Sequence, residues 1–412
     1  MAKNLRLFYL YRFLGEAYFF IPALWLFLQS RGLSATEILL LNSVFCTVVV
    51  LLEVPTGAFA DRVGRRPSMM LGSLAMAAAC LTYWASHSFF GFAAGEALLA
   101  LGFTLSSGAD SAYLYDGLKH AERVEEYQRR EGTASAFKYA GFAIACLLGG
   151  VLATVDLALP YLVSAAACLL ACGVAWRLGE PGRPRLTPLP AATDIAHGMR
   201  HAVLLSVRRP GLRFAILYGA LLFVLARSGL YLYQPKLKAV GFGVAGIGFA
   251  FGIMNLGAAW ASHRADALKR WLGEGRLIWL LPAILVAGYL TLGVASAAWC
   301  AAVLLLQSAA GGASSPLIKG LLQREIPDSR VRATVLSVES LARRLAFGFF
   351  TPILGLLIDR SGRSGGLAAA LLFTAGTGLL GTVVLLGTRE RPLPSAVSLL
   401  RPHSPRAAED PS

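Results

Sequence analysis

The sequence predicts an all-α membrane protein whose twelve transmembrane helices form two pseudo-symmetric six-helix bundles. The first observation behind this is composition: 56% of the 412 residues are hydrophobic and 15% are charged, whereas soluble proteins average about 45–50% and about 25%. The second is a set of long apolar stretches, and the third is a polar break at 177–210 that divides them six and six. A soluble core cannot enclose this much apolar surface, the hydrophobicity excludes a disordered chain, and six cysteines are too few for a disulfide scaffold.

Each apolar stretch is long enough for a transmembrane helix, because a helix rises about 1.5 Å per residue and the hydrocarbon core is about 30 Å thick. The stretches are continuous rather than alternating, which excludes barrel strands. The basic start of the chain resembles a signal peptide, but Arg12 and Glu16 interrupt its apolar run, so we expect a retained first helix. The expected helices are Leu7–Leu28, Thr36–Ala60, Pro67–Ser86, Phe89–Tyr115, Thr133–Ala153, Pro160–Trp176, Gly211–Gln234, Gly243–Ser262, Arg276–Val294, Ala297–Leu322, Val331–Ile358 and Gly366–Leu386.

The polar segments give the domain organisation. We expect an N-terminal bundle over 1–176, a cytoplasmic central loop over 177–210, a C-terminal bundle over 211–388 and a disordered cytoplasmic tail over 389–412. The prolines that open the loop prevent a helix there. Asp194 can cap a short amphipathic helix that follows them, and such a helix suits the cytoplasmic membrane surface.

Positive charge predicts the orientation. If both termini are cytoplasmic, 28 of the 38 Lys and Arg residues fall in cytoplasmic segments and five fall on the opposite face. This bias satisfies the positive-inside rule. The net charge of +15 is therefore a topology signal. We expect no nucleic-acid partner, because no segment outside the membrane is long enough for a folded basic domain.

A charged loop between the second and third expected helices carries the clearest motif. It reads Gly57-Ala-Phe-Ala-Asp61-Arg62-Val-Gly64-Arg65-Arg66. This resembles the signature loop of the major facilitator superfamily, Gly-x-x-x-Asp-Arg-x-Gly-Arg-Arg, at every signature position. The run from Ser107 to Asp116 is similar to the drug:proton antiporter-type bacterial members. The resemblance implies a twelve-helix transporter fold over essentially the whole chain.

The same loop has a physical interpretation. Its glycines allow close packing and a tight turn, and an acid near a helix N-terminus is stabilised by about 0.3–1 kcal/mol. Its arginines can pair with acids at neighbouring helix ends. The resemblance implies that the cluster closes the cytoplasmic gate when the protein opens outward; the alternative is a basic loop that serves topology alone. The predicted gate residues are Gly57, Asp61, Arg62, Gly64, Arg65, Arg66 and, as the pairing acid, Asp116.

Three acids within the expected helices are candidates for proton coupling, since a charge at a helix centre costs at least about 2.5–3.5 kcal/mol. They are Glu16, Glu53 and Glu96. The alternative for Glu16 is a static pair with Arg12, four residues earlier on the same helix face. The alternative for Glu53 is a structural acid beside Pro55. No histidine lies mid-helix, so proton coupling would have to use carboxylates.

Arg227 is the leading substrate-binding candidate, because it stands sixteen residues into the seventh expected helix. A lone arginine among aromatic residues can bind an anionic or aromatic substrate. The alternatives are a salt bridge to an acid of the other half or snorkelling to the outer interface. Tyr18, Tyr139 and Tyr231 are further candidates for the cavity wall.

The other charges within the helices have structural interpretations. Glu339 and Arg343 have the favourable i, i+4 order for an ion pair on one helix. Asp110 lies among serines, which indicates polar packing or a link to the gate. Lys138 lies one turn into the fifth expected helix, and we expect it to snorkel to the cytoplasmic interface.

These observations favour a secondary active transporter of a bacterial inner membrane. The preferred hypothesis is proton-coupled export of a small drug-like or metabolite molecule by alternating access. The alternative is a proton-coupled importer of an anionic metabolite that uses Arg227. A membrane enzyme or sensor is the third hypothesis, and the full loop motif argues against it. We expect substrate, protons and lipid as partners, and a monomer.

We expect no cofactor and no metal. The run from Gly241 to Gly246 fits Gly-x-Gly-x-x-Gly, but a dinucleotide fingerprint follows a strand, and this run opens an apolar helix. The sequence has no Walker loop, so ATP is not the expected energy source.

Overall fold

The computed structural model describes residues 2–180, 192–295, 299–326, 329–360 and 363–387, and every element in these ranges is helical. The predicted disordered tail and the proline-rich start of the central loop lie outside the described residues. The elements are α1 Ala2–Gly15, η1 Ile21–Ala23, α2 Leu24–Ser30, α3 Ala35–Val63, α4 Arg65–Ala85, α5 Phe89–Ser106, α6 Ala109–His120, η2 Val124–Glu126, α7 Tyr127–Val155, α8 Leu159–Trp176, α9 Ala192–Arg208, α10 Pro210–Ala239, α11 Val244–His263, α12 Ala265–Leu272, α13 Glu274–Val294, α14 Cys300–Glu325, α15 Ser329–Arg360 and α16 Arg363–Gly387.

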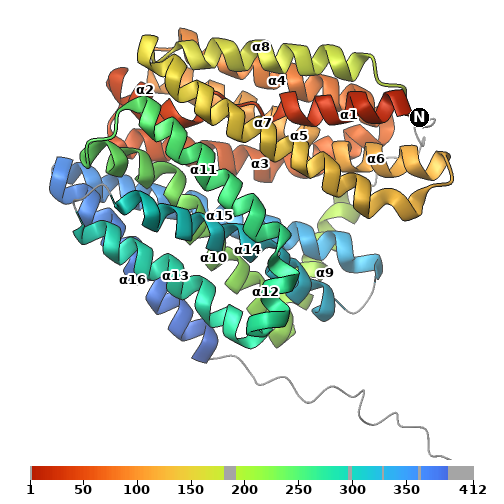
Figure 1. Cartoon of the computed structure of the whole chain (residues 1–412). Coiled ribbons are helices and arrows are strands. Elements are labelled where there is room, and N and C mark those ends of the chain that lie inside the picture. The colour runs from red at the N-terminus through yellow and green to blue at the C-terminus, as the bar shows by residue number, and fades with distance from the viewer. Residues whose placement is uncertain (1, 181–191, 296–298, 327–328, 361–362, 388–412) are drawn as a thin grey trace, which may run out of the picture.

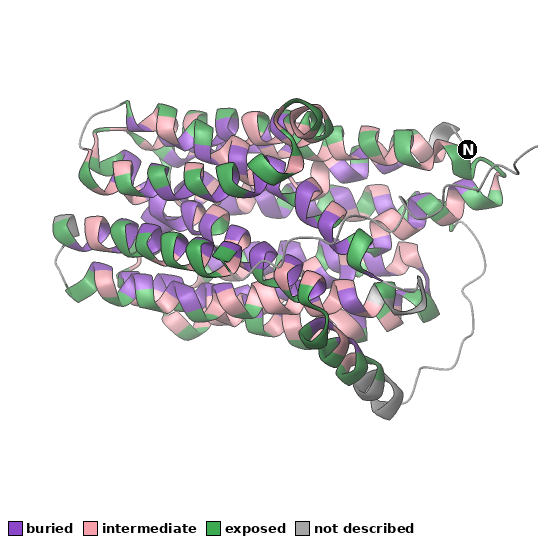
Figure 2. Ribbon diagram, turned by 90° about the horizontal axis from the view of Figure 1, so that it is seen from below, coloured by how far each residue is buried: buried purple, intermediate pink, exposed green. Residues whose placement is uncertain are grey.

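The helices form two bundles that lie side by side, α1–α8 in one and α10–α16 in the other (Figure 1). Within the described part of the chain, eleven helical segments are long and apolar enough to cross a membrane. Buried residues concentrate on the inward faces of the helices (Figure 2). Large apolar side chains such as Leu51, Trp176 and Phe349 are exposed on the outside, as expected of a surface that faces lipid.

The first expected helix is interrupted, so the prediction of one helix over Leu7–Leu28 is wrong. Hydropathy does not register the break, although Gly15 ends α1 and Pro22 lacks an amide hydrogen. The unwound segment packs tightly on α7. A β-carbon at Gly149 would lie 1.9 Å from the carbonyl oxygen of Phe19, so only glycine permits this approach of the two backbones.

Two further differences concern short elements. The fourth expected helix is divided into α5 and α6 at Gly108, whose φ of +84° an L-residue adopts only with strain. The loop between the eighth and ninth expected helices folds into the short helix α12, which the sequence analysis does not predict. The expected helix in the central loop is present as α9, and it packs against α10 and α15.

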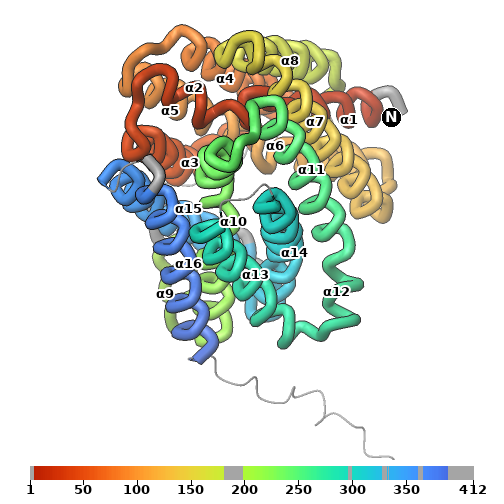
Figure 3. The backbone as a smooth tube through the Cα atoms, turned by 60° about the vertical axis from the view of Figure 1, so that its left-hand side comes forward, coloured from red at the N-terminus to blue at the C-terminus, as the bar shows by residue number. Residues whose placement is uncertain are grey.

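The long helices run between two ends of the molecule that carry different elements. The loop end carries the residues 61–66, together with α6, α9 and α12; the far end carries α2 and the start of α3 (Figure 1). The most extensive packing between the bundles is that of α3 with α15 and of α7 with α11 (Figure 3). A single apolar core cluster includes residues of both bundles.

Candidate functional site

A group of polar contacts closes the interface between the bundles on the far-end side. Asn42 of α3 accepts a hydrogen bond from the hydroxyl of Tyr231 on α10 at 3.0 Å, and its amide donates to Thr351 of α15 at 3.2 Å. The hydroxyl of Ser43 donates to the carbonyl of Gly348 at 2.5 Å. All of these bonds cross from one bundle to the other, so they hold only while the bundles are packed together at this level.

The interrupted first helix adds a second contact. Its break leaves backbone groups without helical partners, and Gln234 of α10 satisfies two of them. The amide hydrogen of Trp25 donates to the Gln234 side-chain oxygen at 2.9 Å, and the side-chain nitrogen donates to the carbonyl of Ile21 at 2.9 Å. Gln234 is fully buried. It therefore ties the first bundle to the second.

At the far end, Asp359 of α15 caps a helix of the other bundle. Its carboxylate accepts hydrogen bonds from the backbone amides of Ala35 and Thr36, at 3.1 and 2.8 Å, and from the Thr36 hydroxyl at 2.6 Å. These amides belong to the first turn of α3, where an anion is stabilised by the helix dipole. We call the contacts of Asn42, Ser43, Gln234 and Asp359 the far-end seal.

Glycines bring α7 and α11 into backbone contact beside the far-end seal. A β-carbon at Gly150 would lie 2.7 Å from the Cα of Gly248, and one at Gly248 would lie 2.6 Å from the Cα of Gly150. Neither position can accept a side chain without displacing the other helix. Small residues at a helix crossing permit such close approach.

Between the bundles lies a cavity of about 430 Å³, which we call the inner cavity. It contains six of the seven residues that the sequence nominates for coupling and binding. They come from the unwound segment of the first helix and from α5, α7 and α10. These lining residues are Glu16, Tyr18, Glu96, Tyr139, Arg227 and Tyr231.

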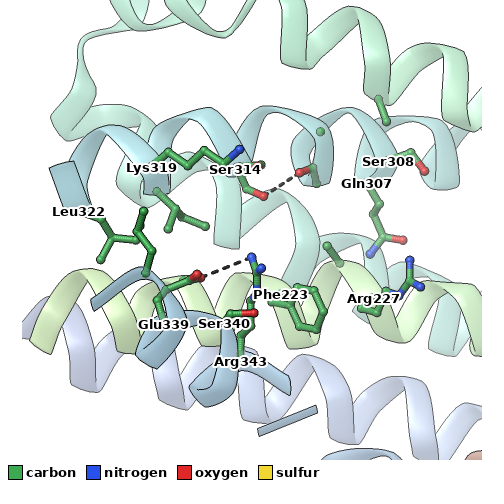
Figure 4. A pocket seen from close by; sticks show the side chains of 18 of the residues that line it. Phe223, Arg227, Gln307, Ser308, Ser314, Lys319, Leu322, Glu339, Ser340 and Arg343 are labelled. Carbon is green, nitrogen blue, oxygen red and sulfur yellow. Dashed lines mark hydrogen bonds and ion pairs between the residues drawn. The ribbon is translucent and has the colours of Figure 1, made fainter. Parts of the chain in front are cut away.

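A second cavity of about 730 Å³, the outer cavity, adjoins the inner cavity. Figure 4 shows side chains that line it. The two share Tyr139, Phe223 and Arg227, so they form one chamber. The seventh nominated residue, Glu53, lines the outer cavity, as does Leu322 near the end of α14. The chamber therefore extends from the far-end seal toward the loop end.

The structure corrects the predicted partner of Glu16. Because α1 ends at Gly15, Glu16 leaves the helix face of Arg12, and the expected static pair between them does not form. Glu16 instead pairs with Lys138 of α7 at 2.7 Å, so Lys138 does not snorkel as predicted. Arg12 forms ion pairs with Asp110 and, at 3.7 Å, with Glu131.

The other two acids have neutral partners. Glu53 of α3 accepts hydrogen bonds from the hydroxyl of Ser340 on α15, at 3.3 and 3.4 Å, which is a contact between the bundles. Glu96 accepts a hydrogen bond from the hydroxyl of Tyr83 at 2.5 Å and is buried. Within the described ranges, neither acid has a Lys, Arg or His nitrogen within 4.0 Å.

Two arginines reach the chamber without a carboxylate in ion-pair contact; at longer range Arg227 interacts electrostatically with Glu96, and Arg344 with Glu53. Arg227 is exposed although it stands in the middle of α10, and it points into the same space as the amide of Gln307 (Figure 4). Arg344 of α15 lines the inner cavity and stacks over the ring of Phe103 on α5, 4.9 Å from the ring centre. Among the described residues, no carboxylate lies within 4.0 Å of either guanidinium. The salt bridge that stood as an alternative for Arg227 is thus not formed within the described residues.

Sequence reasoning did not identify Arg344 as a cavity residue. Its position in the sequence, directly after the pair of Glu339 and Arg343, could have identified it. The two residues of that pair lie 3.5 Å apart, as predicted. Successive residues on a helix point about 100° apart, so Arg344 points away from that pair. Its Nε is buried without a hydrogen-bond partner among the described residues.

The signature loop lies at the loop end. Arg65 contacts Asp61 at 2.5 Å and lies 3.7 Å from the expected acid Asp116. Glu180, which the sequence analysis missed, accepts hydrogen bonds from the backbone amides of Arg65 and Arg66 at 2.9 and 3.4 Å. These contacts all stay within the first bundle.

The two glycines of the signature loop differ in role. Gly64 has φ +120°, and a β-carbon there would lie 2.9 Å from the carboxylate of Glu180. Gly64 is therefore required for the turn. A β-carbon at Gly57 would meet no atom within 4 Å. The close packing predicted for Gly57 is absent from the described structure, and Arg62 is exposed at the surface of the loop.

Comparison with known proteins gives one family and many similar folds. The sequence matches the family described as Major Facilitator Superfamily over residues 9–346, and no curated protein matches it. A point variant of the nucleoside transporter NupG superposes with a TM-score of 0.80 at 11% identity, covering 94% of this chain and 99% of that chain.

Two other solved structures are similar. A POT family transporter in complex with 5-aminolevulinic acid gives a TM-score of 0.72 at 14% identity, with 93% of this chain and 96% of that chain covered. A D-xylose-proton symporter gives 0.71 at 15% identity, with 94% and 96% covered. At these identities the similarity shows the fold alone.

Proposed function

Because the chain belongs to the major facilitator superfamily and has the fold of its secondary transporters, we propose that it moves a small organic molecule across a bacterial inner membrane by proton-coupled alternating access. The observation that carries this proposal is the chamber between the bundles, which the far-end seal closes toward the far end. A site at the interface of two halves can be exposed alternately when the halves rock about it.

The loop end is proposed to face the cytoplasm. Most Lys and Arg residues lie in segments at this end under the predicted topology. The described arrangement is then inward-facing, and both termini are cytoplasmic. In the opposite arrangement the signature loop would exchange some of its present contacts for contacts with the second bundle, as the gate hypothesis requires.

Glu53 is the strongest candidate for proton coupling among the three acids. Its bond to Ser340 joins the bundles and lines the chamber, so its surroundings must change when the bundles separate at this level. A carboxyl whose environment differs between two states binds protons differently in them, and this difference couples proton movement to the transition. Glu96 is the second candidate. Glu16 would first have to leave Lys138.

The direction of transport follows from whether substrate and proton compete. Export by antiport requires that substrate and proton exclude each other at a shared carboxylate, and this remains the first hypothesis for a neutral or cationic drug-like substrate. Import of an anionic metabolite is the second candidate function. Arg227 favours it, because it is exposed to the chamber and no described carboxylate lies within 4.0 Å of its guanidinium.

Proteoliposomes that contain the purified protein and a pH-sensitive dye test the proposal. Addition of a transported molecule is expected to cause proton movement, and an imposed pH gradient to drive the molecule against its concentration gradient. Glu53→Gln, Glu96→Gln and Glu16→Gln are compared with Glu125→Gln, which changes an exposed acid at the loop end. If all three cavity variants behave like the control, the coupling assignment is wrong.

A further inference from the structure

The charges that line the inner cavity are unbalanced. Three cations line it, Lys138, Arg227 and Arg344, against two carboxyls, Glu16 and Glu96. The ion pair of Glu16 with Lys138 neutralises one of each. What remains is two arginines and one acid whose hydrogen-bond partner is a tyrosine hydroxyl.

We propose that the inner cavity binds an organic anion with a flat aromatic body, and that its acidic group lies between Arg227 and Arg344. This rests on the proposed function, since it names the substrate class of the same chamber. A guanidinium offers a planar set of donors that matches a carboxylate or phosphate. An arginine in the membrane interior is costly without a counter-charge, and a bound anion supplies that charge.

The aromatic walls of the cavity suit the flat aromatic body of this ligand. Rings line it from both bundles, and Arg344 is held against one of them, Phe103, on the opposite bundle. Aromatic side chains favour offset or edge contacts with a guest ring. A volume of about 430 Å³ falls within the range of small-molecule sites. These rings include Tyr18, Phe45 and Phe103 of the first bundle and Phe223, Tyr231 and Phe347 of the second.

Protonation of Glu96 should strengthen anion binding. Glu96 faces Tyr83 of α4, to which it is hydrogen-bonded, and it interacts electrostatically with Arg227 of α10. The other titratable groups around it are Cys46 of α3, Tyr161 of α8 and Tyr231 of α10. When Glu96 is ionised, its negative charge offsets part of the positive potential of Arg227. When Glu96 is protonated, that potential acts fully on a bound anion.

This linkage is reciprocal, because a proton that raises anion affinity is itself bound more tightly once the anion is present. Proton and anion then occupy the carrier together. The inference therefore favours co-transport of the two in one direction over exchange. Coupling of this kind between two sites is usually about 5-fold or more in affinity.

Matched ligands test the substrate class. Thermal unfolding of the purified, detergent-solubilised protein is followed with a panel of aromatic monocarboxylates such as phenylacetate, each beside the amide and the amine of the same skeleton. A ligand that binds the folded state raises the unfolding temperature. We expect stabilisation by acids alone. Equal or greater stabilisation by the amides or amines, or none by any acid, overturns the proposal.

Variants test the residues. Arg227→Gln and Arg344→Gln are each expected to weaken binding of a stabilising acid at least 10-fold, and Arg227→Lys to weaken it less because the charge is kept. Arg276→Gln, which changes an exposed arginine at the start of α13, serves as the control and should leave affinity within 2-fold. Far-ultraviolet circular dichroism confirms that each variant is folded. Acid binding that is unchanged in both glutamine variants refutes the assignment.

Affinity measured at different pH values, together with flux in proteoliposomes, separates this inference from the proposed function. Wild-type affinity for the acid should fall about 5-fold or more as the pH is raised and Glu96 loses its proton, and Glu96→Gln should keep the high affinity throughout. An unchanged pH dependence in that variant removes Glu96 from the linkage. In proteoliposomes, acid binding without pH-driven flux contradicts the proposed function but not the ligand class. Flux of amines with no acid binding contradicts the ligand class alone.

Discussion

Replacement of Asp359 by alanine should open the far end of the transporter more often. The carboxylate makes three hydrogen bonds to the first turn of α3, and they exist only while the bundles are closed there. Loss of a helix cap costs about 0.5–2 kcal/mol, and because Asp359 is exposed, which weakens the interactions of its charge, we take about 1 kcal/mol. That free energy changes the ratio of closed to open molecules by about 5-fold.

A native cysteine can report the change. Cys46 is buried on α3 and lines the inner cavity, directly below the seal. In cells or sealed vesicles whose far end faces outward, a membrane-impermeant maleimide is added outside, and the initial rate of Cys46 modification is measured with the other five cysteines replaced by alanine. The rate should rise about 5-fold in Asp359→Ala, and less in Asp359→Asn, which keeps one acceptor oxygen.

The matched control is Glu37→Gln. Glu37 lies on the same turn of α3 and bonds to Ser34 in a capping box, so it acts within one bundle. Its replacement should lower the stability of the fold and leave the labelling rate within 2-fold. If Asp359→Ala labels like the wild type, or if Glu37→Gln labels as fast as Asp359→Ala, the cap does not hold the far end closed.

Three further predictions concern the interior. Glu53→Gln keeps a hydrogen-bond acceptor for Ser340 but cannot exchange a proton, so a transported substrate should equilibrate without accumulating under a pH gradient; retained accumulation would contradict this. Gly150→Val should abolish transport while the protein stays folded, because the added side chain meets the backbone of Gly248, and normal flux would show that the helices need not approach so closely. Arg12→Met leaves Asp110 without its cation and should cost about 3–5 kcal/mol of stability, measured by unfolding in detergent and restored in part when Asp110 is also made apolar.

The sequence was sufficient for features that depend on hydrophobicity and local spacing. Long apolar runs predicted the membrane helices and their division into two bundles, and the i, i+4 spacing of Glu339 and Arg343 predicted their pair. The signature loop predicted the family from ten consecutive residues. These properties are local, and neighbouring residues fix them.

Features that depend on contacts between distant segments could not be predicted in the same way. The unwound segment after Gly15 is stabilised by glycines of α7 and by Gln234, more than 200 residues later. Once the helix breaks there, Arg12 and Glu16 no longer share a face, so their partners come from other helices. A hydropathy average does not detect such breaks. A single sequence also does not reveal which distant helix lies opposite the broken segment.

The backbone contact of Gly150 with Gly248 also determines how far the loop end of α7 can move when the helix tilts. Side chains that interlock resist tilting, but here two bare backbones touch, and one helix can roll on the other. From Gly150 back to its first residue, Tyr127, α7 extends about 35 Å. A tilt of about 10° around this fulcrum displaces that end by about 6 Å, roughly one helical turn. Because this contact lies near the far end of the helix, a small rotation about it produces a large displacement at the loop end.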